Sequence, residues 1–310
     1  MQVEKELAEL SPDKDAMLTI GVFDGVHLGH QYLLSQLKKH AREKNLLSGV
    51  VTFSHHPRAI MLPQTRLPFL TDLNQRIELL KNEGIEVVVV LSFTPELARL
   101  SPHRFVSLLR EHLRMQGLVI GHDFALGQNR KGDTDTLRAL GREMNFSVTV
   151  IPPKKINGEV VSSTAIRQAL THGDMKRVHR LIGRCFSLHG PVITGNHRGV
   201  ELGFPTANLK VDSEQALPAD GVYATRVYID GKAYKSMTNI GLNPTFGCNE
   251  RTIEVYVLDY HRDLYGQELK IDIIDRVRDE KRFDTARQLE EQIAEDIKQG
   301  EAILSRHGRD

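Results

Sequence analysis

Two histidines stand three residues apart at the point where an apolar segment gives way to a helical pattern. The string G-V-F-D-G-V-H-L-G-H begins at Gly21 and contains His27 and His30. Hydrophobic periodicity predicts a strand over 17–22 and a helix over 28–45, so both imidazoles fall at a helix N-terminus. Free backbone amides and the helix dipole attract anions there, and imidazole donors can follow charge that develops on phosphorus. The segment therefore predicts a phosphate-handling site.

A second candidate anion site follows in the same half of the chain. In V-V-S-S-T-A-I-R, three hydroxyl residues precede a predicted helix over 165–171, and Arg167 adds a planar fork that suits triphosphate oxygens. Taken alone, each segment also has a purely structural interpretation. His27 and His30 would be helix-capping residues, the hydroxyl residues would cap the next helix, and Arg167 would face solvent. The hydroxyl residues are Ser162, Ser163 and Thr164.

A glycine-rich segment of a different kind lies in the second half, in G-N-H-R-G-V-E-L-G-F-P-T-A-N-L. Gly195, Gly199 and Gly203 recur every four residues, and such glycines permit tight turns that present amides to phosphate. Thr206 and Asn208 offer neutral oxygens on one side of an extended segment, which suits Mg²⁺ that carries nucleotide phosphates. The structural alternative is a set of hairpin-turn residues.

The elements around the first two segments alternate between apolar strands and amphipathic helices. Further strands are predicted over 48–53, 86–91, 118–121 and 147–151, and helices over 73–82, 102–115 and 134–144. This alternation predicts a parallel sheet covered by helices on both faces, with ligands at the carboxyl ends of the strands. The segments 21–30, 52–57 and 121–124 all follow predicted strands, so we expect them to converge on one crevice.

The pattern changes near residue 185 to short strands separated by Gly, Pro, Asn and Asp. These strands are predicted over 186–193, 221–229, 232–239, 252–258 and 268–277, and an amphipathic helix is predicted over 285–304. Short strands at such spacing are typical of a small antiparallel barrel or sandwich. Glu254 lies in one of them, on the face opposite Ile253, Val255 and Val257, where a strand glutamate is usually just solvated.

Length, charge and cysteine content narrow the class of protein. A chain of 310 residues suits about two domains, each with its own core. The 41 basic and 40 acidic residues nearly cancel, which favours small ligands over nucleic acid. With only Cys185 and Cys248, a disulfide framework is excluded and a reducing cytoplasm is expected. The N-terminus lacks a secretory pattern, and the apolar run 87–91 is too short to span a membrane.

The first half resembles a known group of enzymes. F-D-G-x-H-x-G-H resembles the H-x-G-H signature of nucleotidyltransferases that attack the α-phosphate of ATP. Together with S-S-T-x-I-R, it resembles the adenylyltransferase module of the bifunctional riboflavin kinase/FAD synthetase family. T-F-S-H-H-P-R, L-T-D-L-N-Q-R and G-H-D-F-A-L-G-Q-N-R-K-G-D agree with that family. Class I aminoacyl-tRNA synthetases share H-x-G-H, but their K-M-S-K-S-type loop is absent from this sequence.

The second half resembles the riboflavin kinase module of the same family. The matching strings are G-F-P-T-A-N, N-I-G-L-N-P-T-F and E-V-Y-V-L-D-Y-H-R-D-L-Y-G. In that pattern Glu254 is the catalytic base, which accepts the proton of the ribityl 5′-hydroxyl as the γ-phosphoryl group arrives. The loop around Arg282 and Phe283 is expected to close on flavin. The apolar stripe of the final helix is expected to be core.

The resemblance implies four catalytic residues, namely Glu254, His27, His30 and Arg167. Contacts to ATP or phosphate are expected from Gly21, Phe23, Asp24, Gly25, Gly29, Ser162, Ser163 and Thr164, and in the second half from Gly195, Gly199, Gly203 and Pro205. Flavin contacts are expected from Phe53, His56, Phe124, Asn239 and Arg282, although Phe53 and Phe124 have a core-packing alternative. Thr206 and Asn208 are the expected Mg²⁺ ligands.

The resemblance also implies an architecture and a set of partners. We expect a Rossmann-like nucleotidyltransferase domain over 1–184 and a riboflavin kinase domain over 185–310, the latter a small antiparallel β-barrel with a terminal helix. Expected substrates are riboflavin, FMN and ATP, with Mg²⁺ as cofactor. The protein is expected in the cytoplasm as a monomer or weak oligomer, without nucleic-acid or membrane partners.

Two alternatives follow from departures and gaps in the pattern. Ala125 and Leu126 differ from the usual aromatic-containing form, and Val200 and Glu201 replace more basic or hydroxylic residues. One domain would then be a catalytically silent, flavin-binding regulatory module. A nucleotidyltransferase with another acceptor is the second alternative, but it leaves the second half unexplained.

Overall fold

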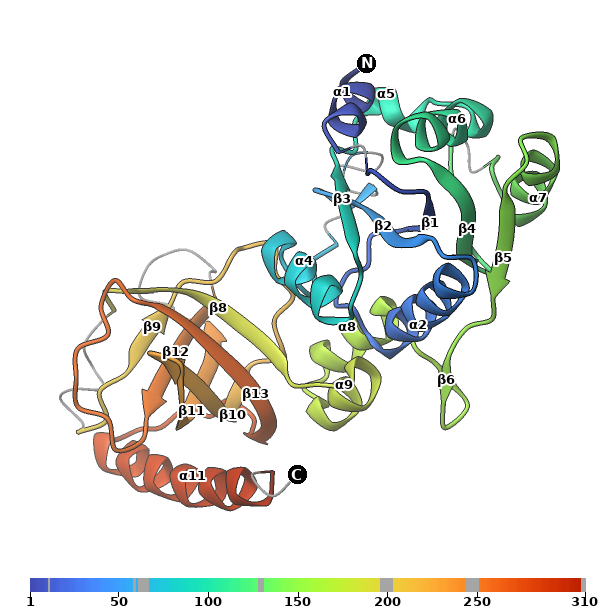
Figure 1. Cartoon of the computed structure of the whole chain (residues 1–310). Coiled ribbons are helices and arrows are strands. Elements are labelled where there is room, and N and C mark those ends of the chain that lie inside the picture. The colour runs from blue at the N-terminus through green and yellow to red at the C-terminus, as the bar shows by residue number, and fades with distance from the viewer. Residues whose placement is uncertain are drawn as a thin grey trace. The chain divides into compact units, whose positions relative to one another are not determined.

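The computed structural model describes residues 1–10, 12–57, 60, 67–127, 131–195, 203–242 and 251–307 (Figure 1). Chain contacts divide it into two compact units, Met1–Ser163 and Thr164–Asp310. This division lies before the predicted boundary at 184/185. The reason is that helix α9 (Met175–Ile182) packs against β8 (Phe186–Ile193) and β13 (Glu268–Arg278) of the second unit.

The first unit is built on a five-stranded parallel sheet in the order β3-β2-β1-β4-β5. This confirms the parallel sheet that the sequence predicts. The strands are β1 (Ala16–Ile20), β2 (Leu47–Phe53), β3 (Val87–Leu91), β4 (Met115–Gly121) and β5 (Ser147–Ile151). The helices are α1 (Gln2–Ala8), α2 (Leu28–Glu43), α4 (Leu73–Asn82), α5 (Pro95–Ala98), α6 (Pro102–Leu113) and α7 (Thr134–Glu143). A short hairpin of β6 (Lys155–Ile156) and β7 (Glu159–Val160) follows.

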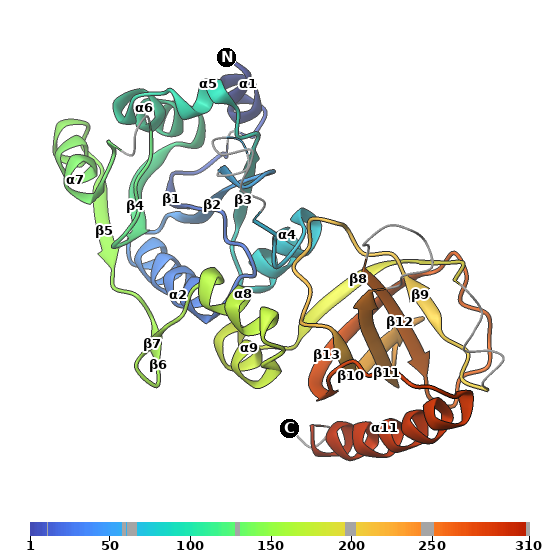
Figure 2. The same cartoon turned by 180° about the vertical axis from the view of Figure 1, so that it is seen from behind.

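The second unit is a closed barrel in the order β10-β11-β12-β9-β8-β13, seen in Figure 2 from the opposite side. Between the two predicted possibilities, the structure therefore selects the barrel. Its remaining strands are β9 (Ala207–Leu209), β10 (Gly221–Ile229), β11 (Lys232–Leu242) and β12 (Arg251–Val257). The helices are α8 (Ser163–Thr171), α9 and α11 (Ala286–Arg306). The sequence does not predict β9 as a strand, because three residues carry too little periodicity.

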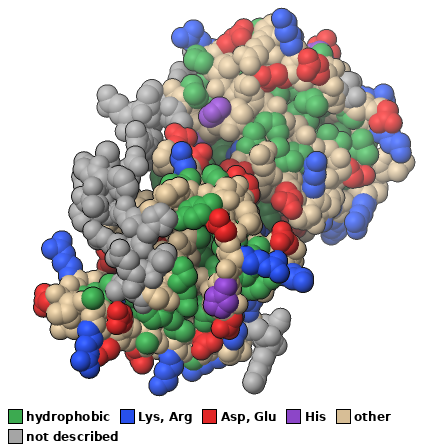
Figure 3. Space-filling view, turned by 90° about the vertical axis from the view of Figure 1, so that its left-hand side faces the viewer, with side chains coloured by type: hydrophobic (Ala, Val, Ile, Leu, Met, Phe, Trp, Pro, Cys, Tyr) green, Lys and Arg blue, Asp and Glu red, His purple; other side chains and the backbone are tan. Residues whose placement is uncertain are grey.

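Charged side chains of both signs alternate over the face of the protein that Figure 3 shows. Lys and Arg lie beside Asp and Glu without gathering into an area of one sign, which agrees with the net charge of +1. None of the helices in the described ranges has the length and apolar composition that crossing a membrane requires.

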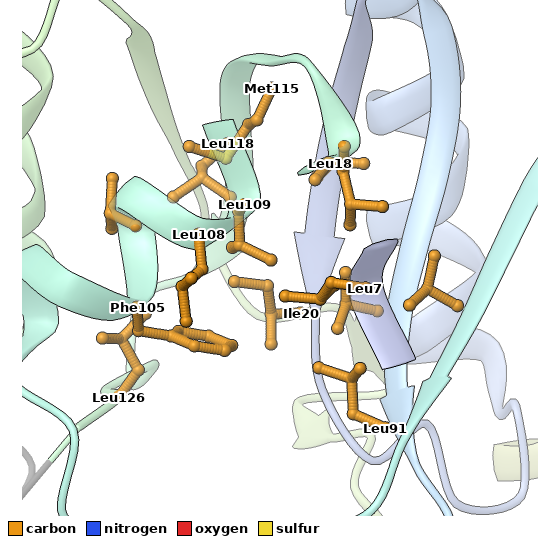
Figure 4. Packing of buried hydrophobic residues seen from close by; sticks show 14 of the residues in the cluster. Leu7, Leu18, Ile20, Leu91, Phe105, Leu108, Leu109, Met115, Leu118 and Leu126 are labelled. Carbon is orange, nitrogen blue, oxygen red and sulfur yellow. The ribbon is translucent and has the colours of Figure 1, made fainter. Parts of the chain in front are cut away.

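The apolar core of the first unit lies on both faces of its sheet. Consecutive residues of β1 alternate between the two layers: Leu18 packs in the cluster with α1, α5, α6 and α7, whereas Met17 packs in the cluster with α2 and α4. Figure 4 shows the first of these clusters, in which Leu7 of α1 meets Ile20 and Leu91 of the sheet. Burial on both faces explains why β3 is a continuous apolar run and why β1 is apolar except for Thr19.

Helix α11 covers the outer face of the barrel where β10 and β11 pair. Gly300 of α11 is in such close contact with Met237 that a Cβ atom there would collide with the methionine sulfur. Leu304 packs with Ala224 and Ile274 in the same layer. Within this layer Asp296, which is 4% exposed, accepts hydrogen bonds from Arg278 Nε at 2.8 Å and pairs with Nη2 at 2.8 Å. A buried, bidentate ion pair therefore attaches the helix to β13.

Removing the carboxylate of this pair should destabilise the second unit selectively. Asp296→Ala leaves the Arg278 charge buried without its partner, and we expect a loss of about 3–5 kcal/mol in the free energy of unfolding. Urea titration followed by tyrosine fluorescence measures it, because Tyr32 is the only tyrosine before Thr164. Glu301→Ala, an exposed substitution on the same helix, is the control and should change that free energy by less than about 0.5 kcal/mol. An equal effect of both substitutions would contradict the ion-pair assignment.

Candidate functional site

The turn after β1 has an unusual backbone conformation. Phe23, Gly25 and Val26 have φ angles of 52°, 81° and 36°, all in the left-handed region. For residues other than glycine, such a conformation costs roughly 1–3 kcal/mol each and persists only where the surroundings hold it. Valine is β-branched and is rarely found there. The turn that carries the candidate histidines is therefore held by its neighbours rather than by local preference.

A buried carboxylate holds this turn. Asp24 is 3% exposed, and its Oδ1 accepts hydrogen bonds from the amides of Leu70 at 2.8 Å and Thr71 at 3.2 Å. In return the amide of Gly25 donates to Thr71 Oγ1 at 3.0 Å, and Ser163 Oγ donates to the carbonyl of Asp24 at 3.1 Å. In this arrangement the carboxylate of Asp24 ties the turn to the backbone at Leu70 and Thr71. Its predicted contact with ATP stays a prediction.

The two histidines form a stacked pair at the start of α2. His27 is the N-cap residue, and its Nδ1 accepts the amide hydrogen of His30 at 3.2 Å. The capping interpretation that the sequence left open is therefore confirmed for His27. The two rings stack with centroids 3.7 Å apart at an interplanar angle of 14°. Because Nδ1 is an acceptor, the proton of the neutral His27 ring is on Nε2, and that atom is its hydrogen-bond donor.

The segment before α8 lies against the same turn. A Cβ atom at Gly29 would lie 3.0 Å from the carbonyl oxygen of Val161 and 3.1 Å from the His27 ring. The glycine therefore allows the chain at Val161 and the imidazole to approach α2 closely. Ser162 and Ser163, which follow directly, are half-buried beside it. This places the two serines of the S-S-T segment near the histidines, as the phosphate hypothesis requires.

The other predicted residues of the adenylylation site are distributed as follows. Gly21 packs against the ring of Phe23, which itself lies 5.1 Å from the His30 ring and is buried. Thr164 is exposed and Arg167 is half-buried on α8. Their roles toward phosphate stay predictions.

The predicted flavin contacts of the first unit lie mainly in its core. Phe53 is 8% exposed, and its ring meets that of Phe93 edge-on at 5.3 Å. Phe124 is half-buried and packs against the same cluster. His56 is half-buried after the end of β2. Both phenylalanine rings therefore have a packing role that the sequence already offered as the alternative.

The barrel aligns three predicted residues in one row. Glu254 of β12 pairs with Asn208 of β9 on one side and with Asn239 of β11 on the other. Residues paired directly across neighbouring strands project from the same face of the sheet. Their neighbours Ile253, Val255 and Ile240 are buried inside the barrel, so the row faces outward, as the sequence predicts for Glu254.

Gly195 of the glycine-rich segment leaves space for the side chain of Asn208 in this row. A Cβ atom at Gly195 would collide with Asn208 Nδ2, so the asparagine side chain occupies the place of a missing side chain. Thr206 stands two residues before Asn208, directly before β9 begins at Ala207. Gly203 has φ of 80° with open space around it, and the nearby Pro205 is exposed. The structure does not describe Gly199, Val200 and Glu201, so the predictions there lie outside the described residues.

Tyr256 extends the same outer face by two residues beyond Glu254. Phe204 packs edge-on against its ring at 5.6 Å and 82°. This aromatic pair forms one side of the surface that carries the row. The sequence did not single it out, because an aromatic residue in a strand is ordinary core composition.

The segment after β13 adds a carboxylate near the other end of the row. Glu280 lies over Gly241, where a Cβ atom would collide with its Oε1. Burial raises the pKa of Glu280, and the charge of Asp220 acts in the same direction. Arg282 is exposed in this segment, and Arg278 lies over the ring of Phe283 at 5.8 Å. Because Glu280 stands in the charged run R-D-E-K-R, the sequence offered no reason to single it out as a candidate site residue.

Within the described ranges, no group of three or more His, Cys, Asp or Glu side chains could hold a metal ion. The predicted ligands offer a hydroxyl from Thr206 and an amide oxygen from Asn208, and the carboxylate of Glu254 stands on the strand paired with Asn208. Such a hard, mostly neutral set suits Mg²⁺ that arrives with nucleotide phosphates and keeps several waters. The donor set therefore fits the predicted cation.

Two protein families match consecutive parts of the chain. The family described as FAD synthetase matches residues 10–165, and the family described as riboflavin kinase matches residues 182–304. The first range contains the histidine turn and the S-S-T residues. The second contains the whole barrel and most of α11.

Curated relatives match nearly end to end. The bifunctional riboflavin kinase/FMN adenylyltransferase of Pseudomonas fluorescens is 36% identical over 308 residues, which cover 98% of each chain. The protein of the same name from Escherichia coli (strain K12) is 35% identical over 288 residues, which cover 92% of each chain. A solved structure from Streptococcus pneumoniae, described as that of a macrolide-efflux protein, has a TM-score of 0.88 at 31% identity, and the match covers 96% of each chain.

The Streptococcus pneumoniae protein is named for efflux, whereas both matching families and the curated relatives are named as flavin enzymes. The structural likeness supports the two folds, and the relatives span both of them. The chain therefore belongs to the bifunctional riboflavin kinase/FMN adenylyltransferase family.

Proposed function

We propose that the second unit phosphorylates riboflavin with ATP and that the histidine turn serves the adenylylation of the resulting FMN to FAD. The observation that carries the kinase assignment is the row in which Glu254 stands between Asn208 and Asn239 on paired strands. Family membership over both halves supports the pairing of the two reactions. The comparisons do not favour the alternative of a silent regulatory module.

In the kinase reaction, Glu254 is the proposed base. Its carboxylate accepts the proton of the ribityl 5′-hydroxyl while that oxygen forms a bond to the γ-phosphorus of ATP, and ADP leaves. Thr206 and Asn208 are the proposed ligands of Mg²⁺. A Mg²⁺ ion held by these residues would neutralise phosphate charge, and Gly195 and Gly203 are proposed to contact the same phosphates. Asn239 on the adjacent strand is proposed to contact the flavin, and Arg282 to cover it.

In the adenylylation reaction, a phosphate oxygen of FMN attacks the α-phosphorus of a second ATP, and pyrophosphate leaves. The N-terminus of α2 attracts the phosphates, and His27, whose Nδ1 accepts the His30 amide hydrogen, is proposed to donate to them from Nε2. His30 stacks on His27 and is the second proposed donor. Arg167 and the hydroxyls of the S-S-T segment are proposed to bind the same anion.

Several further properties of the protein are proposed. The riboflavin kinase match begins at residue 182, which supports a functional boundary at 184/185. We propose that the protein works in the cytoplasm, as a monomer or weak oligomer, on small molecules rather than on nucleic acid. The balance of 41 basic against 40 acidic residues supports the last point.

Replacing the proposed base should remove one activity only. In Glu254→Gln the carboxylate becomes an amide that cannot accept the hydroxyl proton, so FMN formation should fall by about 10²–10⁴-fold. FAD formation from supplied FMN should be unchanged. Both are measured by chromatography of riboflavin, FMN and FAD after incubation with ATP and Mg²⁺. Loss of both activities in a folded variant would refute the two-site assignment.

The opposite split is expected for the histidine turn. His30→Ala removes a proposed donor to the phosphates, so FAD formation should fall by about 10²–10³-fold while FMN accumulates from riboflavin. His40→Ala is the matched control, since His40 lies on the same helix away from its N-terminus. Equal FAD formation by the two variants would contradict a role for His30.

A methyl group at Gly195 should disturb the kinase site through Asn208. Because a Cβ atom there collides with Asn208 Nδ2, Gly195→Ala should displace the asparagine and raise the Mg²⁺ concentration needed for half-maximal FMN formation. Titration of Mg²⁺ at saturating ATP and riboflavin measures this shift. The tyrosine spectrum and FAD formation from FMN serve as controls for folding. An unchanged Mg²⁺ requirement would show that Asn208 does not act on the cation.

A further inference from the structure

The segment L-T-D-L-N-Q-R, which ends at Arg76 on α4, has no role in the two reactions as proposed above. Its contacts nevertheless converge on the site. Arg76 is 5% exposed; its Nη1 donates to the carbonyl of Val22 at 2.8 Å and its Nη2 to the carbonyl of Phe53 at 2.9 Å. One planar guanidinium therefore joins two segments that lie far apart in the sequence.

These two carbonyls stand at neighbouring strand ends. β1 and β2 pair in parallel, Val22 opens the histidine turn just after β1, and Phe53 is the last residue of β2. Thr52 Oγ1 also donates to the carbonyl of Val22, at 3.0 Å. The guanidinium thus sets the position of the turn relative to the end of β2, where the segment with His56 begins.

The geometry requires an arginine. Two donors fixed in one plane can bind two carbonyls at once, whereas the ammonium of lysine is a single point charge on a flexible stem. Burial lowers the pKa of Arg76, and the charges of Asp24 and Asp72 act in the opposite direction. Its buried Nε has no hydrogen-bond partner among the described residues. Burying a cation costs free energy, and here the cation lies next to a turn with left-handed backbone conformations. Such a cost is expected where the protein must fix the position of that turn.

We propose that Arg76 is a positioning residue for adenylyl transfer, which fixes the phosphate-binding turn against the carboxyl end of β2 without touching substrate. The proposal rests on the proposed function of the histidine turn. A group that orients the reacting parts acts mainly on kcat, because it brings two bound substrates into line rather than binding either of them. At the other end of the segment, Leu70 and Thr71 hold the same turn through hydrogen bonds with Asp24 and Gly25.

The test compares Arg76→Met and Arg76→Lys in FAD formation from FMN and ATP by the full-length protein. A displacement of about 1 Å in the turn can cost roughly 10²-fold, so we expect kcat to fall by about 10- to 100-fold in both variants. KM for ATP and for FMN should change by less than about threefold, since the proposed substrate contacts remain. Riboflavin phosphorylation by the second unit should be unchanged, which serves as an internal standard for the amount of enzyme.

Arg110→Met is the matched control. Arg110 lies on α6 of the same unit, its Nη1 also donates to a backbone carbonyl, that of Met144, and its Nε likewise has no partner among the described residues. FAD formation by this variant should be unchanged. Thr52→Val is a milder second variant for the event that Arg76→Met does not fold. It removes only the hydroxyl bond to Val22, and kcat should fall by a few-fold at constant KM.

Each other result would overturn the proposal. Full activity of Arg76→Lys would show that charge suffices and that the fork is not needed. A rise of KM for ATP that accounts for the whole loss would make Arg76 a binding residue. Unchanged kcat in both Arg76 variants, or in Thr52→Val if those variants do not fold, would show that Arg76 has only a packing role. If His30→Ala retains FAD formation, the proposed function fails; if it loses FAD formation while Arg76→Met does not, only the positioning role fails.

Discussion

Backbone pairing between strands decides which side chains can meet in both units. In the barrel, the register of β9, β12 and β11 puts Asn208, Glu254 and Asn239 opposite one another, and a shift by one residue would turn each of them toward the interior. In the parallel sheet, pairing of β1 with β2 brings the carbonyls of Val22 and Phe53 within reach of one guanidinium. The candidate chemistry depends on these registers.

The two units stabilise their sites in different ways. The turn after β1 is held by buried polar groups, with Asp24 on two amides and Arg76 on two carbonyls. Such groups are costly to bury and gain most when every donor and acceptor meets a partner. The barrel site instead relies on missing side chains, since Gly195 leaves room for Asn208 and Gly241 for Glu280. A substitution therefore disturbs the first site by removing a bond and the second by adding an atom.

Most of the fold was predictable from hydrophobic periodicity. The strands 147–151, 186–193 and 221–229 and the helix 73–82 agree with the structure at both ends. The helices α1 and α9 were not predicted, because short helices carry few apolar repeats and take their stability from packing. Strand β9 was not predicted for a similar reason, since its three residues carry too little periodicity. The contact division at Ser163 was not predicted either, since the packing of α9 on β8 and β13 is a long-range property.

The candidate site shows the same division between local pattern and long-range contact. The sequence by itself determined the family, the two chemistries and the residue types at the helix N-terminus and in the G-F-P-T-A-N segment, because these are local strings. It also placed Glu254 opposite the apolar face of its strand, since the strand period is two. Only the tertiary structure decided that Asp24 and Arg76 hold the histidine turn, that the Phe53 ring lies in the core, and that Glu280 lies over Gly241. Those contacts join residues distant in sequence, and no local periodicity carries information about which distant backbone groups a buried charge will meet.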